Sequence, residues 1–317
     1  MRFSVLSHFA SMNQHEIEIV CQYPLKYNPF SSRSSLIKLL RKIRIKYNEL
    51  IAIFKLLKYL AVTDCFLWIE KGEWIPYYIF KFLSYRNKTC IYLNDNFTKS
   101  FNVGRHFSLR LKQADFLLCA DDYYLLVPDN IKKLYLLKRG AGDLFFKHHS
   151  YKPSIDAICF VGSYELERYQ YMLEAANHNL IFHIYGNNWP TNSNHSNIFF
   201  HKAVYDDEFI KVHRKYKVYL NFVRKSNNDL TTSRSYELLA MRVPFISEYS
   251  ESHEMLYKSD NFLFRDSKDF TNKLLQIFTN ESYYNDLISH LSSLDRLQYS
   301  YSSILLPVLS NIINEDL

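Results

Sequence analysis

Short apolar runs alternate with longer segments of helical character along most of this 317-residue chain. A short apolar run suits a buried strand, and a helical segment between two such runs suits a crossover connection. Strands joined in this way lie parallel in one sheet, with helices on its faces. The alternation therefore predicts an α/β fold that is built from parallel βαβ units.

The predicted strands form two groups along the chain. The first group comprises Phe3–Leu6, Glu16–Cys21, Cys65–Ile69, Thr89–Leu93, Phe116–Cys119 and Tyr135–Leu137, with a long helix at Leu36–Leu60. The second group comprises Ile155–Val161, Leu180–Tyr185, Ile198–Phe200, Val218–Phe222, Pro244–Ser247 and Asn261–Phe264. Helices are predicted at Glu165–Asn177, Asp206–Tyr216, Ser233–Met241 and Ser267–Thr279, and helical structure at Glu281–Glu315.

A chain of this length exceeds one ordinary domain of roughly 100–200 residues, so two domains with separate cores are expected. We predict a Rossmann-like domain at residues 1–150, a second one at 151–295, and a C-terminal helix at 296–317 that returns to the first domain. The segment Gly140–Pro153 is interpreted as the linker. Two doubly wound domains would face each other across a cleft, which is where such folds bind ligands.

The charge is divided unequally between the two halves of the chain. Residues 1–150 carry 23 Lys and Arg against 12 Asp and Glu, a net charge of +11, whereas residues 151–317 carry 16 against 20, a net charge of −4. A basic first half implies an anionic partner, such as acidic lipid or an anionic acceptor. Nucleic acid is not expected as a partner, because no nucleic-acid-binding motif accompanies the charge.

The predicted helix at residues 36–60 interleaves Lys and Arg with Leu, Ile and Phe, which gives it a basic amphipathic face. Such a helix can lie on an anionic membrane surface. The same pattern suits a helix that packs on the core with its basic side in water, or one that binds a protein partner. The sequence leaves these three interpretations open.

The five cysteines, Cys21, Cys65, Cys90, Cys119 and Cys159, are widely spaced and form no CxxC pair. They indicate reduced core thiols in a cytosolic protein rather than a zinc site. No signal peptide is evident, and no apolar run approaches the ~20 residues that span a bilayer. We therefore expect a cytoplasmic protein that is soluble or peripheral on the inner face of the cytoplasmic membrane.

The segment before the strand Pro244–Ser247 carries two carboxylates. Asp229 and Glu237 have seven residues between them at the start of a predicted helix. With Thr232 or Ser233 as its cap, Glu237 lies in the first turns and can accept hydrogen bonds from the two hydroxyls of a ribose. Asp229 can bind hydroxyls of a transferred sugar. The alternative is a charged loop before an exposed helix start.

Basic side chains lie close to these carboxylates in the sequence. Arg224 and Lys225 follow a predicted strand and are placed to neutralise a leaving pyrophosphate, with Arg234 as a further cation. The neutralisation matters because cleavage of a glycosidic bond to a diphosphate builds negative charge on the leaving group.

Two strand ends of the second domain carry groups that suit a sugar donor with a nucleoside diphosphate. Gly162 and Ser163 lead into a helix, so backbone N–H groups and the helix N-terminus can face a pyrophosphate, with Arg168 nearby. The next strand ends in a turn that offers polar groups and aromatic rings to a base. The candidate residues of this turn are Tyr185, Gly186, Asn187 and Trp189. An ordinary strand-to-helix turn and a polar turn at a core edge are the alternative interpretations.

In the first domain, the strand Thr89–Leu93 ends in Asn94, Asp95 and Asn96, which would face the cleft. Asp95 can orient or deprotonate an acceptor hydroxyl, and a cap or turn is the structural alternative. It is the candidate catalytic residue on the acceptor side.

With these motifs in this order, the chain resembles the GT-B glycosyltransferases, and within them the spore-maturation-protein-like (CgeB-like) branch of the group-1 glycosyltransferases. The resemblance rests on the segments DCFLWIEKGEWI, IYLNDN, ICFVGSYELERYQYM, FHIYGNNW and NNDLTTSRSYELLAMRVPFISEYSESHEMLY. It spans roughly residues 60 to 265 and is most specific in the second domain.

The resemblance implies a UDP- or GDP-linked sugar donor bound mainly by the second domain, and a saccharide, lipid-linked or protein acceptor bound by the first. It implies a hexosyltransferase-like enzyme of polysaccharide biosynthesis that needs no metal or other cofactor and retains the anomeric configuration. Glu237 matches the ribose-binding acid of the family, and Asp229 stands where related enzymes have a Glu that contacts the transferred sugar. The segment Ser7–Ala10 replaces the usual glycine-rich turn after the first strand.

Two other functions are consistent with the same residues. A sugar-nucleotide epimerase or a phosphorylase of GT-B type uses the same fold, and an epimerase needs no acceptor. A non-enzymatic membrane- or polymer-binding protein would use the basic first half, with a vestigial donor site.

Overall fold

The computed structural model describes residues 53–54, 56–57, 65–70, 75–93, 96, 106–120, 123, 127, 131–147, 151–190 and 195–314. The chain divides into two compact units, here called the N-terminal and C-terminal units, and the division among these residues falls between Lys138 and Arg139. This division lies ahead of the boundary that the sequence predicts at residue 150. The predicted strands Phe3–Leu6 and Glu16–Cys21 and most of the predicted helix Leu36–Leu60 lie outside the described residues.

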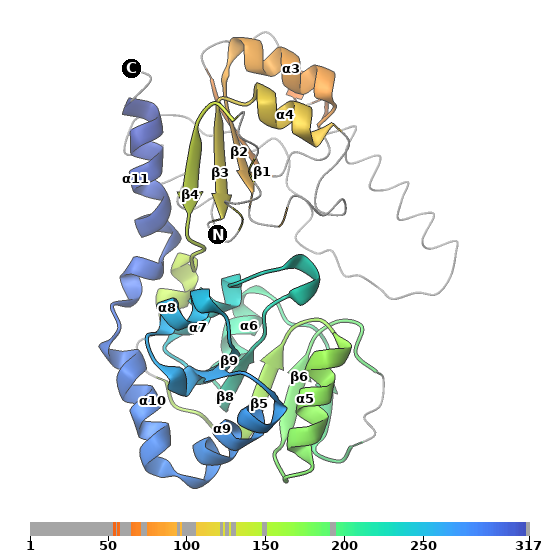
Figure 1. Cartoon of the computed structure of the whole chain (residues 1–317), viewed down its shortest axis with the longest axis vertical. Helices are drawn as coiled ribbons and strands as arrows, with labels where there is room; N and C mark the ends of the chain where they lie inside the picture. Colours follow the sequence, from red (N-terminus) through yellow and green to blue (C-terminus); the bar gives the residue numbers. More distant parts are fainter. Residues whose placement is uncertain are drawn as a thin grey trace. The chain divides into compact units, whose positions relative to one another are not determined.

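The N-terminal unit holds a parallel sheet with the strand order β1-β2-β3-β4 (Figure 1). Its strands are β1 (Phe66–Glu70), β2 (Lys88–Leu93), β3 (Phe116–Ala120) and β4 (Leu134–Leu137). Helix α3 (Tyr77–Arg86) connects β1 to β2, and α4 (Phe107–Gln113) precedes β3 and packs against α3. Strands β2 and β3 are almost wholly buried, which explains their continuous apolar sequences.

The C-terminal unit holds a parallel sheet with the strand order β10-β9-β8-β5-β6-β7. Its strands are β5 (Ile155–Val161), β6 (Phe182–Tyr185), β7 (Ile198–His201), β8 (Tyr216–Asn221), β9 (Phe245–Glu248) and β10 (Leu263–Phe264). The chain starts in the middle of the sheet at β5, runs outward to β7, and returns to β8 on the other side of β5. This is the doubly wound Rossmann arrangement, which binds ligands where the strand order reverses, at the carboxyl ends of β5 and β8.

Helices connect and follow the strands of the C-terminal unit (Figure 1). They are α5 (Leu166–Ala176), α6 (Asp206–Val212), α7 (Ser233–Met241), α8 (Glu251–Tyr257), α9 (Ser267–Thr279), α10 (Glu281–Ser293) and α11 (Tyr301–Asn314). Single turns of 3-10 helix are η3 (Asp143–Phe146), η4 (Lys225–Asn227), η5 (Asp260–Phe262) and η6 (Arg296–Tyr299). Helix α9 contacts β9, β10 and α5, so α5 and α9 cover the same face of the sheet.

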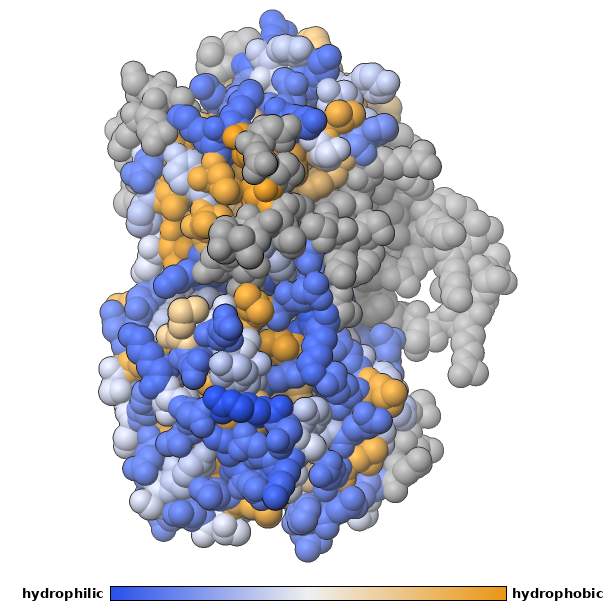
Figure 2. Space-filling view, viewed as in Figure 1, coloured by the Kyte–Doolittle hydropathy of each residue, from blue (hydrophilic) through white to orange (hydrophobic). Residues whose placement is uncertain are grey.

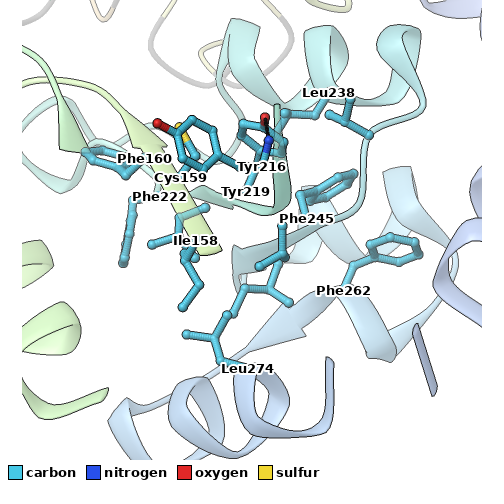
Figure 3. Close-up of a cluster of buried hydrophobic side chains, with 14 of the residues drawn as sticks. Ile158, Cys159, Phe160, Tyr216, Tyr219, Phe222, Leu238, Phe245, Phe262 and Leu274 are labelled. Atoms are coloured by element: carbon cyan, nitrogen blue, oxygen red, sulfur yellow. Dashed lines mark hydrogen bonds between the residues drawn. The ribbon is translucent and has the colours of Figure 1, made fainter. Parts of the chain in front are cut away.

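Side chains from both faces of this sheet form the core of the C-terminal unit (Figure 3). Successive strand residues point to opposite faces, so Phe160 and Cys159 lie on different sides of β5. Phe160 packs edge-on against Phe222, with ring centroids 5.5 Å apart. Cys159 is buried and forms no disulfide, and the same holds for Cys90 and Cys119 in the N-terminal unit. The predicted place of these three cysteines in the core is confirmed, and their reduced state in a cytosolic protein stays a prediction.

Two predicted helical segments differ from the structure by more than one residue at an end. Helix α6 ends at Val212, because Tyr216 begins strand β8 where the sequence indicated a continuing helix. The helical segment predicted to begin at Glu281 is interrupted by η6. Oδ1 of Asp295 accepts a hydrogen bond from the Leu297 N–H at 3.1 Å and caps the start of this turn.

The segment Gly140–Pro153, interpreted from the sequence as a linker, contributes to the C-terminal unit. Ala141 forms a parallel bridge with Ser300, and Phe145 is buried in the core of this unit. The described residues of the segment therefore pack on the C-terminal unit in addition to connecting the two units.

No helix among the described residues has both the length and the apolar character that a membrane crossing requires. On the face shown in Figure 2, hydrophilic side chains cover most of the C-terminal unit, and hydrophobic ones form small separate areas. The membrane contact predicted for residues 36–60 stays a prediction, because most of that segment lies outside the described residues.

Candidate functional site

A cavity of about 290 Å³ opens in the C-terminal unit beside the carboxyl ends of β5 and β6. Its volume is close to the lower end of the range of roughly 300–1,000 Å³ for small-molecule sites. Seven of the predicted donor-site residues line it: Gly162, Ser163, Tyr185, Gly186, Asn187, Arg234 and Glu237. The structure thus brings together two strand-end loops and one helix that are far apart in the sequence.

The two loops approach each other closely at Gly162 and Gly186. The Gly162 N–H donates to the carbonyl oxygen of Tyr185 at 2.9 Å. A Cβ atom on Gly186 would lie 1.8 Å from the Gly162 carbonyl oxygen, so no residue with a side chain fits there. Glycine at position 186 is therefore needed to bring both loops to the cavity.

Helix α7 supplies the charged side chains of the cavity. Nη1 of Arg234 lies 3.2 Å from Oε2 of Glu237, which is three residues further along the helix. The Arg234 guanidinium also lies over the ring of Phe209, 3.8 Å from its centroid. Burial raises the pKa of Glu237, which Arg234 opposes, and burial lowers the pKa of Arg234. The cavity therefore presents a carboxylate and a guanidinium that are paired and poorly hydrated.

The first turn of α7 is fixed by its cap. Thr232 is the N-cap residue, and its backbone N–H donates to Ser235 Oγ at 3.1 Å. Thr232 Oγ1 donates to Oδ1 of Asn221 at 3.2 Å, which ties the helix start to the end of β8. Ser233, the first helical residue, does not line the cavity. Because Arg234 lines it, the positive end of the helix dipole lies close to the cavity.

A buried polar network supports the start of α7. Asn221 Nδ2 lies 3.0 Å from Ser235 Oγ, from Ser247 Oγ and from Tyr257 OH. His253 contacts two of these hydroxyls, with Nε2 2.8 Å from Ser235 Oγ and Nδ1 3.1 Å from Ser247 Oγ. All five side chains are buried, so the network links α7 to β8, β9 and α8 away from water. The sequence did not predict it, because its members are far apart along the chain.

Arg168 and Trp189 hold the loops from outside the cavity. Arg168 donates from Nη1 to the carbonyl oxygen of Ser163 at 3.4 Å and from Nη2 to that of Val223 at 3.0 Å, which joins the ends of β5 and β8. Trp189 Nε1 donates to the carbonyl oxygen of Gly162 at 2.8 Å. Neither side chain lines the cavity, so direct contact of either with a donor stays a prediction.

The residues predicted to neutralise a pyrophosphate lie at the carboxyl end of β8. Lys225 forms ion pairs with Glu167 and with Glu248, whose Oε1 lies 2.9 Å from Nζ. Burial lowers the pKa of Lys225, but the hydrogen bonds to the two carboxylates outweigh this effect and raise the pKa. Arg224 beside it is exposed. A diphosphate would therefore compete with two carboxylates for Lys225, whereas Arg224 is open to solvent.

Asp229 is held in a buried ion pair. Its Oδ1 lies 3.4 Å from Nη2 of Arg139 and accepts a hydrogen bond from Asn227 Nδ2 at 2.7 Å. The side chains of Arg139 and Asp229 are 3% and 9% exposed. These contacts are structural, and the predicted contact of Asp229 with a transferred sugar stays a prediction. The other predicted catalytic carboxylate, Asp95, lies outside the described residues.

Apolar and aromatic residues complete the walls of the cavity. Those not predicted as site residues are Leu144, Phe145, Val161, Ala203, Val204, Tyr205 and Phe209. Short apolar stretches without polar motifs are a weak signal for a site. Residues 203–205 follow strand β7, so their place at the carboxyl end of a parallel strand is the signal that points to them.

Among the residues that the structure describes, no group of three or more His, Cys, Asp or Glu side chains is arranged to hold a metal ion. The charged groups that line the cavity are Arg234 and Glu237, which can bind an anion and hydroxyl groups respectively. Independence from metals and other cofactors stays a prediction.

Comparison with known proteins gives a family match and a fold. Residues 168–288 match a family model described as glycosyl transferase-like. A search of curated protein sequences finds no match. The HepE protein of Anabaena, in complex with UDP and glucose, is similar with a TM-score of 0.60 at 8% identity, over 82% of this chain and 81% of that chain. An alpha-glucosyltransferase in complex with UDP-glucose and DNA containing an abasic site is similar with a TM-score of 0.58 at 11% identity, over 82% of this chain and 83% of its own.

At these identities, the similarity to solved structures establishes the fold. The predicted α/β class with two Rossmann-like domains is confirmed. The CgeB-like branch is not distinguished from other branches and stays a prediction. The chain has the GT-B fold of glycosyltransferases, and its segment 168–288 carries the sequence pattern of a glycosyl transferase-like family.

Proposed function

We propose that the chain is a glycosyltransferase that moves a sugar from a UDP- or GDP-linked donor to a saccharide, lipid-linked or protein acceptor. The observation that carries the proposal is the cavity in which the half-buried carboxylate of Glu237 pairs with Arg234 at the start of α7. A carboxylate accepts hydrogen bonds from ribose hydroxyls, and a guanidinium beside a helix N-terminus favours a diphosphate. Ribose and diphosphate thus each have a matching group in one cavity.

The similar structures favour UDP as the nucleotide to test first. The Anabaena protein was solved with UDP and glucose, and the alpha-glucosyltransferase with UDP-glucose. A UDP-sugar is therefore our first candidate donor, and a GDP-sugar is the second.

In the proposed reaction, the bond between the anomeric carbon and the diphosphate breaks, and negative charge grows on the leaving group. Arg224, which is exposed, and Arg234 are the cations proposed to meet this charge. Lys225 joins them only after it exchanges its two carboxylate partners for phosphate. Asp229 is proposed to contact the transferred sugar and Asp95 the acceptor hydroxyl. The reaction is proposed to need no metal and to retain the anomeric configuration, as the family resemblance implies.

The proposed setting is surface-glycan biosynthesis in the cytoplasm, at the inner face of the cytoplasmic membrane. The net charge of +11 in residues 1–150 supports this setting, because anionic lipids attract basic surfaces. Binding to anionic liposomes that weakens with added salt is the expected result, since salt screens exposed charges. Absence of binding to anionic liposomes at every salt concentration would contradict the proposed membrane setting.

Replacing Glu237 with alanine is expected to weaken UDP binding by about 10- to 100-fold. The reason is the loss of a charged acceptor, because hydrogen bonds to charged groups contribute roughly 1.5–3 kcal/mol. Isothermal titration of both proteins with UDP and with GDP measures the dissociation constants. Glu281→Ala, which changes an exposed glutamate on α10, is the matched control and should leave the affinity unchanged. Equal UDP affinity in wild type and Glu237→Ala would contradict the proposed site.

Product analysis separates a transferase from the alternatives. Incubation of the protein with a UDP-sugar and a mixture of acceptors is expected to give UDP and a glycosylated acceptor. Conversion of the donor sugar in the absence of acceptor would instead identify an epimerase. Liposome binding without any nucleotide binding would identify a binding protein with a vestigial site.

A further inference from the structure

His213 is a buried histidine beside the charged pair of the cavity. It follows the last residue of α6 and is 1% exposed. Nδ1 lies 2.7 Å from the carbonyl oxygen of Phe209, and Nε2 lies 3.4 Å from Nη1 of Arg234. The histidine does not line the cavity, so it can affect a ligand there only through its neighbours.

The two contacts of His213 define its tautomer. A carbonyl oxygen only accepts hydrogen bonds, so Nδ1 carries the proton and Nε2 holds the lone pair. A guanidinium only donates, so Arg234 donates to Nε2. Burial lowers the pKa of His213 well below its usual range, and the nearby Arg234 lowers it further. The ring is therefore neutral at neutral pH and accepts from the guanidinium.

The ring of His213 is held in place by aromatic neighbours. It stacks on Tyr219 with centroids 4.7 Å apart and an interplanar angle of 14°, and its centroid lies 3.9 Å from that of Phe209. Tyr219 is itself fixed, because its hydroxyl donates to the carbonyl oxygen of Val212 at 2.9 Å. Nε2 of His213 is thus an acceptor in a fixed position.

We propose that His213 is a positioning residue for donor binding. By accepting from Arg234, it holds the guanidinium over Phe209 in the orientation that pairs with Oε2 of Glu237. The carboxylate of Glu237, which lines the cavity, is then held in one position for hydrogen bonds from the ribose of a donor. The inference rests on the proposed function, because it takes the ligand of the cavity to be a nucleoside diphosphate.

Two substitutions separate the acceptor role of His213 from its packing. His213→Asn keeps an N–H donor near the position of Nδ1 but lacks an acceptor at the position of Nε2. His213→Gln can place a carbonyl oxygen near the position of Nε2. The measured quantity is the ratio of the dissociation constants of 2′-deoxy-UDP and UDP, which reports the contact between Glu237 and the ribose 2′-hydroxyl.

We expect a ratio of about tenfold in wild type, since one hydrogen bond to a charged group is lost with the 2′-hydroxyl. The ratio is expected to fall to about twofold in His213→Asn and to stay within about twofold of wild type in His213→Gln. An unchanged ratio in His213→Asn would overturn the proposal. An equal loss in both variants would also overturn it, because packing rather than the acceptor would then be responsible.

A double-mutant cycle without ligand tests the contact itself. The effect of Arg234→Met on the unfolding equilibrium constant is expected to be about fivefold smaller in His213→Asn than in wild type, as for side chains in direct contact. If the wild-type protein binds nucleotide but the effects of Arg234→Met and His213→Asn on the unfolding equilibrium constant are fully additive, the positioning role alone is overturned. Absence of nucleotide binding by the wild-type protein would overturn the proposed function, and the donor-positioning role with it, even if the cycle shows coupling.

Discussion

Replacing Gly186 with alanine is expected to lower the free energy of unfolding of the C-terminal unit by about 3 kcal/mol or more. The added Cβ would lie 1.8 Å from the carbonyl oxygen of Gly162 and 2.7 Å from its carbonyl carbon. Backbone atoms cannot rotate away as a side chain can, so the loops after β5 and β6 must separate. The hydrogen bond from Trp189 Nε1 to the Gly162 carbonyl is expected to be strained at the same time, because the new Cβ would lie 2.9 Å from that nitrogen.

Urea unfolding followed by circular dichroism measures this loss. Gly162→Ala is the matched control, because its Cβ would meet Cζ of the Phe160 ring at 2.6 Å. That atom is the far end of a side chain and can shift, so the loss in the control is expected to be smaller. A Gly186→Ala protein as stable as wild type, or more stable than Gly162→Ala, would contradict the close approach of the two loops.

Local sequence signals were sufficient for part of the fold and of the site. Strand β5 and helices α7 and α9 have the predicted bounds, Ile155–Val161, Ser233–Met241 and Ser267–Thr279. Each follows from an apolar run or from apolar spacing behind a capping residue. Gly162 and Glu237 were predicted to share a site because ligands of doubly wound sheets bind at strand ends and helix starts, and both line the cavity.

Contacts between distant residues could not be predicted from such signals. The sequence predicts a diphosphate contact for Lys225, but it does not reveal that Glu167 on α5 and Glu248 on β9 pair with this lysine. Arg139 pairs with Asp229, ninety positions further along the chain. An isolated charge in a sequence has many possible partners, and only the packing of the elements selects one.

Three helices within the described part of the chain, α3, α4 and α8, do not follow from the sequence prediction. The start of α8 carries a recognisable signal, because Ser250 Oγ accepts a hydrogen bond from the His253 N–H at 3.0 Å and Glu251 and Glu254 lie in the first turn. Helix α3 is rich in aromatic residues, which favour strands as well as helices when they pack. Its helical state depends on packing against the sheet, which a single sequence does not reveal.

Acidification from pH 7 to pH 4 is expected to remove up to about 3 kcal/mol of stability through His253. Burial lowers the pKa of this histidine from its usual 6.5 to about 4; its hydrogen bond to the Glu248 carbonyl opposes the shift, and Arg139 adds to it. The unfolded chain therefore takes up a proton near pH 6.5, whereas the folded protein does so only near pH 4. The contribution of neutral His253 to the free energy of unfolding is therefore complete above pH 6.5, and it is lost as the pH falls toward 4.

The neighbours of His253 explain why the protonated ring is disfavoured. Nδ1 lies 2.8 Å from the Glu248 carbonyl oxygen and carries the proton of the neutral ring. Nε2 then accepts from Ser235 Oγ at 2.8 Å, and Asn221 Nδ2, also a donor, lies 3.5 Å away. A second proton on Nε2 would face these donors, and the link between α7 and α8 would weaken.

His253→Gln removes the titrating group and can place a carbonyl oxygen near the position of Nε2. Urea unfolding of wild type and variant at a series of pH values from 7 to 4 measures the difference. Over this range, the free energy of unfolding of the wild type is expected to fall by up to about 3 kcal/mol more than that of the variant. Groups present in both proteins cancel in the comparison, including His213, whose pKa is also lowered by burial, and Glu237, whose pKa is raised by burial. Parallel pH profiles for the two proteins would show that His253 is protonated equally in the folded and unfolded chains, which the buried network does not allow.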